Sequence, residues 1–306
     1  MDLSVVVPTL NARDRVVASL DALAEHAPDA EVVVVNGPSS DGTTGAVRDH
    51  PAADALLELS ERNLNSARNA GIAAADGDVI ALVGQDSRIR EGWTAAIADA
   101  MASDVAVATG PVHRRVSGGV TTEEPETATI GSRSVTYFDG GNVAFTADVL
   151  ETLDGFDQYL HTGAARDLAH RLAAIGAAVA WRPEMVVLRE EEDDVVHRVG
   201  EDDPQTVLGL KYRSMAYRLA KNYGLAVRPG YRLIRHAVLE AASEGWDVLR
   251  GEADVSTWLS TGRSFAENAT RGLREGLAAR AADEPPRRNP HGVTARSQSP
   301  ISTYSL

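Results

Sequence analysis

The chain alternates short apolar runs with segments of helical periodicity. The apolar runs are "LSVVV" at 3–7, "VVVV" at 32–35, "VIALV" at 79–83 and "VAVA" at 105–108. Between them, residues 14–26 and 66–76 place apolar side chains three and four positions apart, which is typical of helices that bury one face. Strands that are apolar on both faces belong to mainly parallel sheets covered by helices on both sides. The pattern therefore predicts a Rossmann-like α/β fold.

Polar segments follow three of the predicted strands. They are "PTLN" at 8–11, "NGPSSDGT" at 36–43 and "GQDS" at 84–87. Ligands of open α/β sheets bind beyond the carboxyl ends of the strands. We therefore expect these three segments to meet at one edge of the sheet and to form the functional site.

The remainder of the chain is less regular. Residues 113–132 are typical of a mobile loop that leaves the sheet. Residues 165–176 have helical spacing, and the pattern from about 205 to 281 is helical again. The last residues, from Asp283, are rich in proline and serine, which favours disorder. We predict an α/β domain at 1–203, a helical appendage at 204–282 and a disordered tail at 283–306.

Composition narrows the function classes. The formal net charge of the 306 residues is −14, and only two of the 30 basic residues are lysines. Such a surface suits a protein from a salt-adapted source, although a GC-rich genome also replaces lysine by arginine. A net negative field disfavours a nucleic-acid partner. No cysteine is present, the first residues lack a signal pattern, and no run has the length of a membrane span, so we expect a cytoplasmic location.

The basic residues concentrate in one segment. Residues 204–239 contain seven lysines and arginines, four of the seven tyrosines, and no Asp or Glu. Tyrosine beside basic residues on an amphipathic helix suits a lipid headgroup boundary, so this segment predicts peripheral contact with an anionic membrane. The alternative is a helix that packs on the catalytic domain.

The order of motifs resembles family 2 glycosyltransferases with the GT-A fold. The resemblance covers roughly residues 1–190. It rests on "SVVVPTLNARDRVVASLDAL", "EVVVVNGPSSDGT", "NLNSARNAGIAAADGDVIALVGQDSRI" and "GGNVAFTADVLETLDGFDQ", in this order. The resemblance implies transfer of a sugar from a nucleotide donor.

On the donor side, the resemblance and the residue chemistry select eight candidates. Thr9 and Asn11 have short polar side chains that reach a nucleoside, and Asn36 stands where the family usually has an aspartate. Asp41 precedes a glycine, so it is either a turn residue or a ligand. An arginine at position 68 suits a base edge or diphosphate oxygens. The full set is Pro8, Thr9, Asn11, Asn36, Asp41, Arg68, Asn69 and Asp86.

The resemblance also implies a divalent cation. The family usually ends the third strand with Asp-x-Asp, whose second carboxylate holds Mg²⁺ or Mn²⁺ against the donor diphosphate. This chain has Gly84-Gln85-Asp86, so we expect Asp86 to be the metal ligand. His197 is a second candidate ligand, although Arg189 occupies the more natural strand-end position.

The acceptor side departs further from the family pattern. Gly140, Gly141 and Asn142 match its acceptor-side block. Inverting members usually carry Glu-Asp-x-Asp before the late helix, whereas this chain has Ala164 and Ala165 at the first two positions. Asp167 is the remaining acid: it is either the general base or a carboxylate at the start of a helix.

The resemblance implies a glycosyltransferase that inverts the anomeric centre. The expected donor is a UDP-sugar, and the expected acceptor is a glycan on a polyprenyl (dolichol-type) phosphate, in surface-layer N-glycosylation on the cytoplasmic face of the membrane. One rival is a catalytically degenerate relative that binds a sugar nucleotide or a partner, which the alanine pair favours. A second rival, a sugar-1-phosphate nucleotidyltransferase, would need a Gly-rich loop that "PTLNARDR" lacks.

Overall fold

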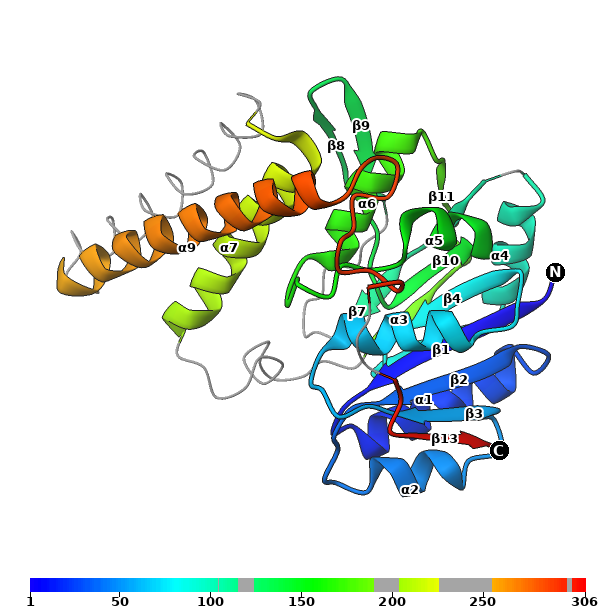
Figure 1. Cartoon of the computed structure of the whole chain (residues 1–306). Helices are drawn as coiled ribbons and strands as arrows, with labels where there is room; N and C mark the ends of the chain where they lie inside the picture. The colour runs from blue at the N-terminus through cyan, green and yellow to red at the C-terminus, as the bar shows by residue number, and fades with distance from the viewer. Residues whose placement is uncertain (104, 115–123, 190–203, 226–254, 296–298) are drawn as a thin grey trace.

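A computed structural model describes residues 1–103, 105–114, 124–189, 204–225, 255–295 and 299–306. Its centre is a sheet of eight strands in the order β11-β6-β10-β4-β1-β2-β3-β13 (Figure 1). The strands are β1 (Leu3–Thr9), β2 (Glu31–Asn36), β3 (Ala55–Glu58), β4 (Val79–Val83), β6 (Val107–Thr109), β10 (Asn142–Thr146), β11 (Val179–Trp181) and β13 (Ser302–Ser305). The predicted α/β fold is confirmed.

Most neighbouring strands run parallel, as expected for strands that are apolar on both faces. β1 pairs in parallel with β2 and β4, and β2 with β3. β10 is antiparallel to both of its neighbours, β4 and β6, and β13 is antiparallel to β3. In β1, Val5 and Val7 belong to one apolar cluster and Val6 to the other, so each face of the sheet has a core of its own.

Helices cover both faces. α1 (Arg13–His26), α2 (Thr43–Arg48) and α4 (Trp93–Met101) contribute side chains to the first core. α3 (Leu64–Ala74), α5 (Ala147–Leu153) and α6 (Ala164–Ile175) contribute to the second. Beside the main sheet lie a small sheet of β5 (Ser87–Ile89), β12 (Val187–Arg189) and β7 (Val112–Arg114), and a hairpin of β8 (Thr127–Ile130) and β9 (Arg133–Thr136).

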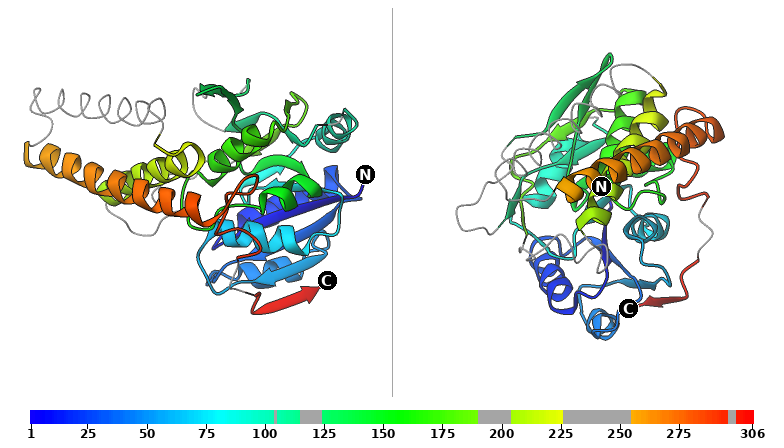
Figure 2. Two further views of the ribbon diagram at one scale, coloured as in Figure 1. Left: turned by 45° about the horizontal axis from the view of Figure 1, so that its top comes forward. Right: turned by 90° about the vertical axis from the view of Figure 1, so that its left-hand side faces the viewer.

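Two long helices form the appendage, α7 (Pro204–Tyr223) and α9 (Val255–Ala282), which lie against each other beside the sheet (Figures 1 and 2). Two glycines of α9 permit this close approach. A methyl group on Gly272 would lie 2.2 Å from the Arg213 carbonyl oxygen, and one on Gly276 would lie 2.3 Å from that of Tyr217. The expected helical appendage is therefore present, and α7 packs on the α/β domain.

The described part of the basic segment, residues 204–225, differs from the predicted membrane surface. Lys221 is fully buried, and Tyr212 and Tyr217 are 2% and 1% exposed. Arg213 is paired with Glu275 of α9. These side chains face the protein, which favours the packed-helix alternative; the rest of the segment, with Arg228, Tyr231, Arg232 and Arg235, lies outside the described residues. Within the described ranges, no helix is both long enough and apolar enough to cross a bilayer.

The prediction of a disordered tail is wrong for the described residues after Asp283. The amide of Asn289 donates to the carbonyl of Asp154 at 2.7 Å, and the carboxylate of Asp154 accepts from the backbone N–H and the hydroxyl of Thr294. β13 then pairs with β3 and extends the sheet (Figure 1). Composition favoured disorder, but long-range hydrogen bonds, which composition does not report, order this part of the chain.

Candidate functional site

The three polar loops meet at the carboxyl edge of the sheet, as predicted. The backbone N–H of Leu10 donates to the side-chain oxygen of Gln85 at 2.8 Å. The backbone N–H of Asn11 donates to Ser39 Oγ, and Asn11 Oδ1 accepts from the N–H of Ser40, both at 2.8 Å. Asn11 has a φ of 46°, a left-handed conformation that asparagine tolerates better than most residues. These bonds hold the loops after β1, β2 and β4 together.

Thr9 and Asn36 lie side by side at the ends of β1 and β2. The Asn36 amide donates to Thr44 Oγ1 at 2.9 Å, and its oxygen accepts from Ser39, so this side chain is used within the fold. Thr9 is 4% exposed, and its Oγ1 has no hydrogen-bond partner among the described residues. A buried hydroxyl that is left unsatisfied is costly, so Thr9 marks a position that suits a polar ligand.

Asp41 lies in a turn at this edge. Its carboxylate accepts from the backbone N–H of Arg13, the first residue of α1, and from the N–H and hydroxyl of Thr43. Burial raises the pKa of Asp41, but these hydrogen bonds outweigh that effect and hold the pKa below its usual value. The contacts favour the turn alternative. Pro8, a further candidate, is buried within β1.

Arg68 and Asn69 face different surroundings. Arg68 donates to the side chain of Asn65 and to the Gly140 carbonyl, both at 3.0 Å, and stacks on Phe156. Its guanidinium therefore lies beside the predicted acceptor-side loop. Asn69 is fully buried and exchanges two hydrogen bonds of 2.8 Å with the backbone of Phe156. Asn69 thus holds α3 to the loop after α5, and its polar atoms do not face the site.

Asp86 lies beside an arginine. Its Oδ1 is 3.5 Å from Arg189 Nε, and its side chain is 4% exposed. Arg189 forms a two-pronged pair with Asp139, at 2.9 and 2.8 Å. Burial raises the pKa of Asp139, but the hydrogen bonds and charge of Arg189 lower it further, to about 2, so this carboxylate is charged at neutral pH. The sequence analysis missed Asp139, although an aspartate directly before a glycine pair is a signal that could have found it.

The described residues do not form a complete site for the expected divalent cation. None of their His, Cys, Asp and Glu side chains form a group of three or more around a possible ion. Mg²⁺ and Mn²⁺ prefer several oxygen ligands, whereas Asp86 has the positive charge of Arg189 beside it. His197, the other expected ligand, lies outside the described residues. The guanidinium of Arg189 thus occupies the neighbourhood in which the prediction placed a metal.

The predicted acceptor-side glycines lie between the two arginines. A methyl group on Gly140 would lie 2.6 Å from Arg68 Nη2, and one on Gly141 would lie 2.8 Å from Arg189 Nη2. The absence of a side chain at both positions therefore admits both guanidinium groups. Asn142 is fully buried, accepts from the indole of Trp93 and donates to two backbone carbonyls. Asn142 supports the loop and does not face an acceptor.

Asp167 does not have the surroundings of a general base. It is fully buried and accepts hydrogen bonds from Lys221 and Arg171. Burial raises its pKa, but the charges of Lys221 and Arg171 lower it further, to about 2. A base works best when its pKa lies near the working pH and when it touches the substrate, so the structural alternative is favoured. Ala164 and Ala165 form the start of α6, as the sequence indicated.

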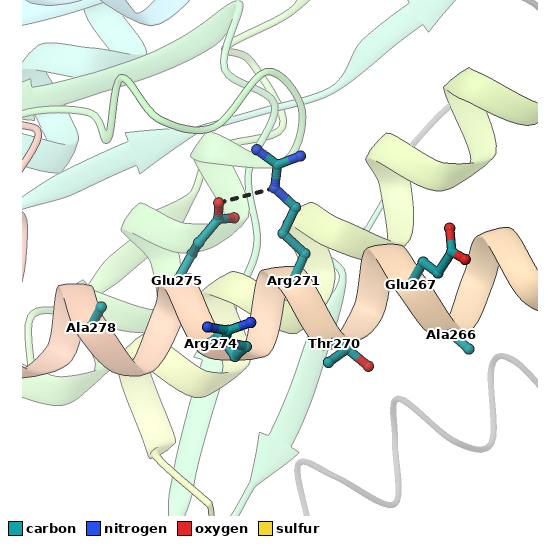
Figure 3. Close-up of a pocket in the computed structure, with 7 residues that line it drawn as sticks. All are labelled: Ala266, Glu267, Thr270, Arg271, Arg274, Glu275 and Ala278. Carbon is teal, nitrogen blue, oxygen red and sulfur yellow. Dashed lines mark hydrogen bonds and ion pairs between the residues drawn. The ribbon is translucent and has the colours of Figure 1, made fainter.

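A pocket lies against α9, away from this edge (Figure 3). The lining residues that the structure describes belong to α9: Ala266, Glu267, Thr270, Arg271, Arg274, Glu275 and Ala278. Arg271 and Glu275 are paired across it at 3.1 Å. Among the described residues, those of the sheet edge bring several elements together, so this edge is the candidate site.

The comparison with protein families agrees with this geometry. Residues 4–151 match the family model described as glycosyl transferase family 2. These residues form a family 2 glycosyltransferase domain. They include β1 to β4, the three loops of the edge and the glycine pair at 140–141. The resemblance inferred from the sequence motifs is therefore confirmed at the level of the family.

Known relatives match only part of the chain. Two Mycobacterium tuberculosis proteins, from strains CDC 1551 / Oshkosh and ATCC 25618 / H37Rv, are described as pre-mycofactocin glycosyltransferase; each is 25% identical over 210 residues. The match covers 62% of this chain and 43% of theirs. Succinoglycan biosynthesis protein ExoO of Rhizobium meliloti strain 1021 is 38% identical over 92 residues, 29% of this chain and 26% of that protein. The chain thus spans less than half the length of these relatives.

Solved structures resemble the chain over most of its length. S. aureus TarS 1-349, in complex with UDP-GlcNAc, has a TM-score of 0.62 at 15% identity, covering 92% of this chain and 91% of that one. The mannosyltransferase PcManGT from Pyrobaculum calidifontis, in complex with GDP-Man and Mn²⁺, has a TM-score of 0.53 at 19% identity, covering 92% and 86%. At these identities the likeness confirms the GT-A fold.

Proposed function

We propose that this protein transfers a sugar from a nucleotide donor to an acceptor hydroxyl. The observation that carries the proposal is the Thr9 hydroxyl, which is buried and has no hydrogen-bond partner among the described residues, at the edge where open α/β sheets bind ligands. Arg68 and Arg189 add two guanidinium groups at the same edge, and such groups bind diphosphate oxygens well. Solved structures of the same fold are complexes with UDP-GlcNAc and with GDP-Man; of the two nucleotides, UDP and GDP, we propose UDP.

In the proposed reaction, the acceptor oxygen forms a bond to the anomeric carbon while the bond from that carbon to the diphosphate breaks. The electron pair leaves with the nucleoside diphosphate, and the hydroxyl proton passes to a base. Attack from the side opposite the leaving group gives inversion. Asp167 is too deeply buried for the role of base, so that role falls to a group outside the contacts described above, and the acidic run at 190–194 lies outside the described residues.

For the acceptor we propose a glycan on a polyprenyl (dolichol-type) phosphate. Of the seven basic residues in 204–239, Arg213 and Lys221 are paired within the protein. The support is the positive charge of the other five, in a chain whose net charge is −14. The acidic, lysine-poor composition supports a salt-adapted source, and with it the assembly of a surface-layer N-glycan at the cytoplasmic face of the membrane. The Asp86 cation of the sequence prediction is not part of this proposal.

A second candidate is a protein that binds a sugar nucleotide without turning it over. Ala164 and Ala165 favour it, because they stand where inverting members of the family carry acids. Asp167, the remaining acid, is paired with Lys221 in the protein interior. The two candidates share the donor site and differ in whether a nucleoside diphosphate is released.

The substitution Thr9→Val tests the donor site, because it should lower the affinity for the donor without lowering the stability of the protein. If the hydroxyl serves a ligand, valine should weaken binding of a UDP- or GDP-sugar by roughly tenfold, and it should leave stability unchanged or raise it, because an unsatisfied buried hydroxyl costs about 1–3 kcal/mol. Calorimetric titration and thermal melting measure the two effects. Thr129→Val, in the hairpin strand β8, is the control. A destabilised variant with unchanged affinity would overturn the assignment of Thr9.

Turnover separates the two candidates. Wild-type protein with UDP- and GDP-sugars and a lipid-linked acceptor should release nucleoside diphosphate and add one sugar mass to the acceptor. Binding of the donor without release, across such a panel, would establish the binding protein instead.

A further inference from the structure

A cavity of about 260 Å³ lies between the β8–β9 hairpin, α6 and α7. Part of its wall is apolar and aromatic and consists of Ile130, Tyr137, Tyr212, Met215 and Leu219. All five are buried, with exposed fractions of 8% or less. The cavity therefore offers an apolar surface that reaches below the protein surface.

Cationic side chains surround this apolar wall. Among the described residues, Arg166, Lys211 and Arg218 line the cavity together with one carboxylate, that of Glu126. Glu126 and Arg166 form a two-pronged pair with distances of 2.8 and 2.5 Å, and the Arg166 guanidinium lies 4.4 Å from the centre of the Tyr137 ring. The described part of the lining thus carries three cations and one carboxylate, in a protein whose overall charge is −14.

The cavity adjoins the start of α6, which also lies beside the edge of the sheet that we assign to the donor. Arg166 follows Ala165, whose Cβ lies 3.4 Å from a methyl group built on Gly140, the residue that contacts Arg68. On the other side, Arg218 reaches the backbone before α6: a methyl group on Gly163 would lie 2.5 Å from Arg218 Nη1. A ligand in the cavity would therefore project its end towards the edge that we assign to the donor.

We propose that this cavity binds the phosphate-bearing end of the acceptor, a phosphate or diphosphate group joined to an apolar chain. The inference rests on the proposed function and places its acceptor. Guanidinium and ammonium groups bind phosphate oxygens through charge-assisted hydrogen bonds, and the tyrosine, methionine and leucine side chains bury the first part of the chain. Because pockets that enclose whole drug-sized ligands measure about 300–1,000 Å³, this cavity suits a headgroup and the first isoprene unit.

The experiment titrates the full chain with farnesyl phosphate, with inorganic phosphate and with farnesol, at one fixed ionic strength. Farnesyl phosphate should bind at least roughly tenfold more tightly than either half of the molecule alone, since only the complete probe engages both the cations and the apolar wall. Equal affinity for inorganic phosphate would overturn the lipid assignment and leave a plain anion site. Equal affinity for farnesol would show that the cations do not take part, which also overturns it.

Charge reversal locates the binding. Lys211→Glu changes an exposed side chain of α7, so the fold should survive, and Arg218→Glu changes the deeper cation. Each should weaken farnesyl phosphate binding by roughly tenfold or more, whereas Arg274→Glu, an exposed arginine on α9, should leave it unchanged. Thermal melting of every variant identifies those that fail to fold. Unchanged binding by a folded Lys211→Glu variant together with a folded Arg218→Glu variant would overturn the site.

Binding of UDP and GDP by the same preparations separates this inference from the proposed function. A wild-type protein that binds nucleotide but not farnesyl phosphate overturns the cavity assignment and leaves sugar transfer standing. A protein that binds neither overturns both.

Discussion

Lys221 and Asp167, which are 54 residues apart in the chain, form an ion pair of 2.7 Å in which neither side chain is exposed to solvent. Lys221 also contacts Asp157 at 2.6 Å, and Asp167 accepts from Arg171 and from Asn222. This buried network joins α7 to α6 and to the loop after α5. Asp167, the acid that sequence comparison offered as a base, is thus the centre of the contact between appendage and domain.

Removing one partner of this network should destabilise the protein strongly. Lys221→Met leaves two buried carboxylates without their shared cation, and losses of about 3–5 kcal/mol are typical of such changes. Denaturant unfolding of the wild type and of the variant measures the difference. The control is Lys211→Met, on the same helix but exposed, which should cost little. A loss of less than about 1 kcal/mol for Lys221→Met would show that the network does not hold α7.

The pH dependence of stability should report Asp139. Its pKa is about 2 in the folded protein against a usual value of 3.8, so the folded state binds the proton less readily than the unfolded state. The stabilisation is therefore complete above about pH 4 and is lost as the pH falls towards about 2. Wild type should be more stable than Asp139→Asn at neutral pH, and the gap should narrow over that interval. A gap that stays constant from pH 6 to pH 3 would contradict the pairing with Arg189.

Arg189 should oppose the binding of a divalent cation next to Asp86. Its guanidinium lies 3.5 Å from that carboxylate, so a cation bound to Asp86 would lie close to a second positive charge, and like charges repel each other in a partly buried site. Arg189→Gln should therefore raise the affinity for Mn²⁺ alone, by roughly tenfold or more, in a titration without nucleotide. The double variant Arg189→Gln/Asp86→Asn should lose the gain. If the wild type already binds Mn²⁺ as tightly as Arg189→Gln, the sequence prediction of a metal at Asp86 is restored.

The contact between α7 and α9 should depend on Gly276. A methyl group at this position would lie 2.3 Å from the Tyr217 carbonyl oxygen. This oxygen belongs to the backbone, so moving it would shift the helix α7 and cost free energy. Gly276→Ala should cost about 1–3 kcal/mol through overpacking, although alanine favours helix. Gly45→Ala in α2, where no atom lies within 4 Å of the added methyl group, is the matched control and should stabilise slightly. Equal effects at the two positions would show that the helices can separate without loss.

The sequence predicted the sheet and the edge at which its polar loops meet, because those features depend on local patterns. Apolar runs identified β1, β2 and β4, and the polar loops after them meet as the parallel topology requires. It also selected Arg68, which lies at that edge, and Thr9, whose hydroxyl has no hydrogen-bond partner in the described part of the chain. A parallel α/β sheet fixes the edge at which such loops gather, so this inference needed no knowledge of side-chain contacts.

The failures have a common physical origin in long-range pairing. Asp167 was a candidate base because it stands in an acidic motif of the family, and Lys221 was a candidate membrane contact because it lies in the basic segment. In the structure the two side chains form a buried ion pair. Asn69 and Asn142 likewise use their amides to hold backbone from distant segments. Arg189 and Asp139, 50 residues apart, became a pair only in the fold. Neither residue type nor spacing reports such partners.

The pairing of β3 with β13 has a consequence for synthesis on the ribosome. β3 is made roughly 240 residues before the strand that covers its outer edge, which at translation rates of about 5–20 residues per second leaves that edge open for roughly 10–50 seconds. Exposed strand edges recruit other chains, and Leu56 and Leu57 make this one apolar. During that interval the nascent chain depends on dilution, or on a chaperone, for protection that its own last strand later supplies.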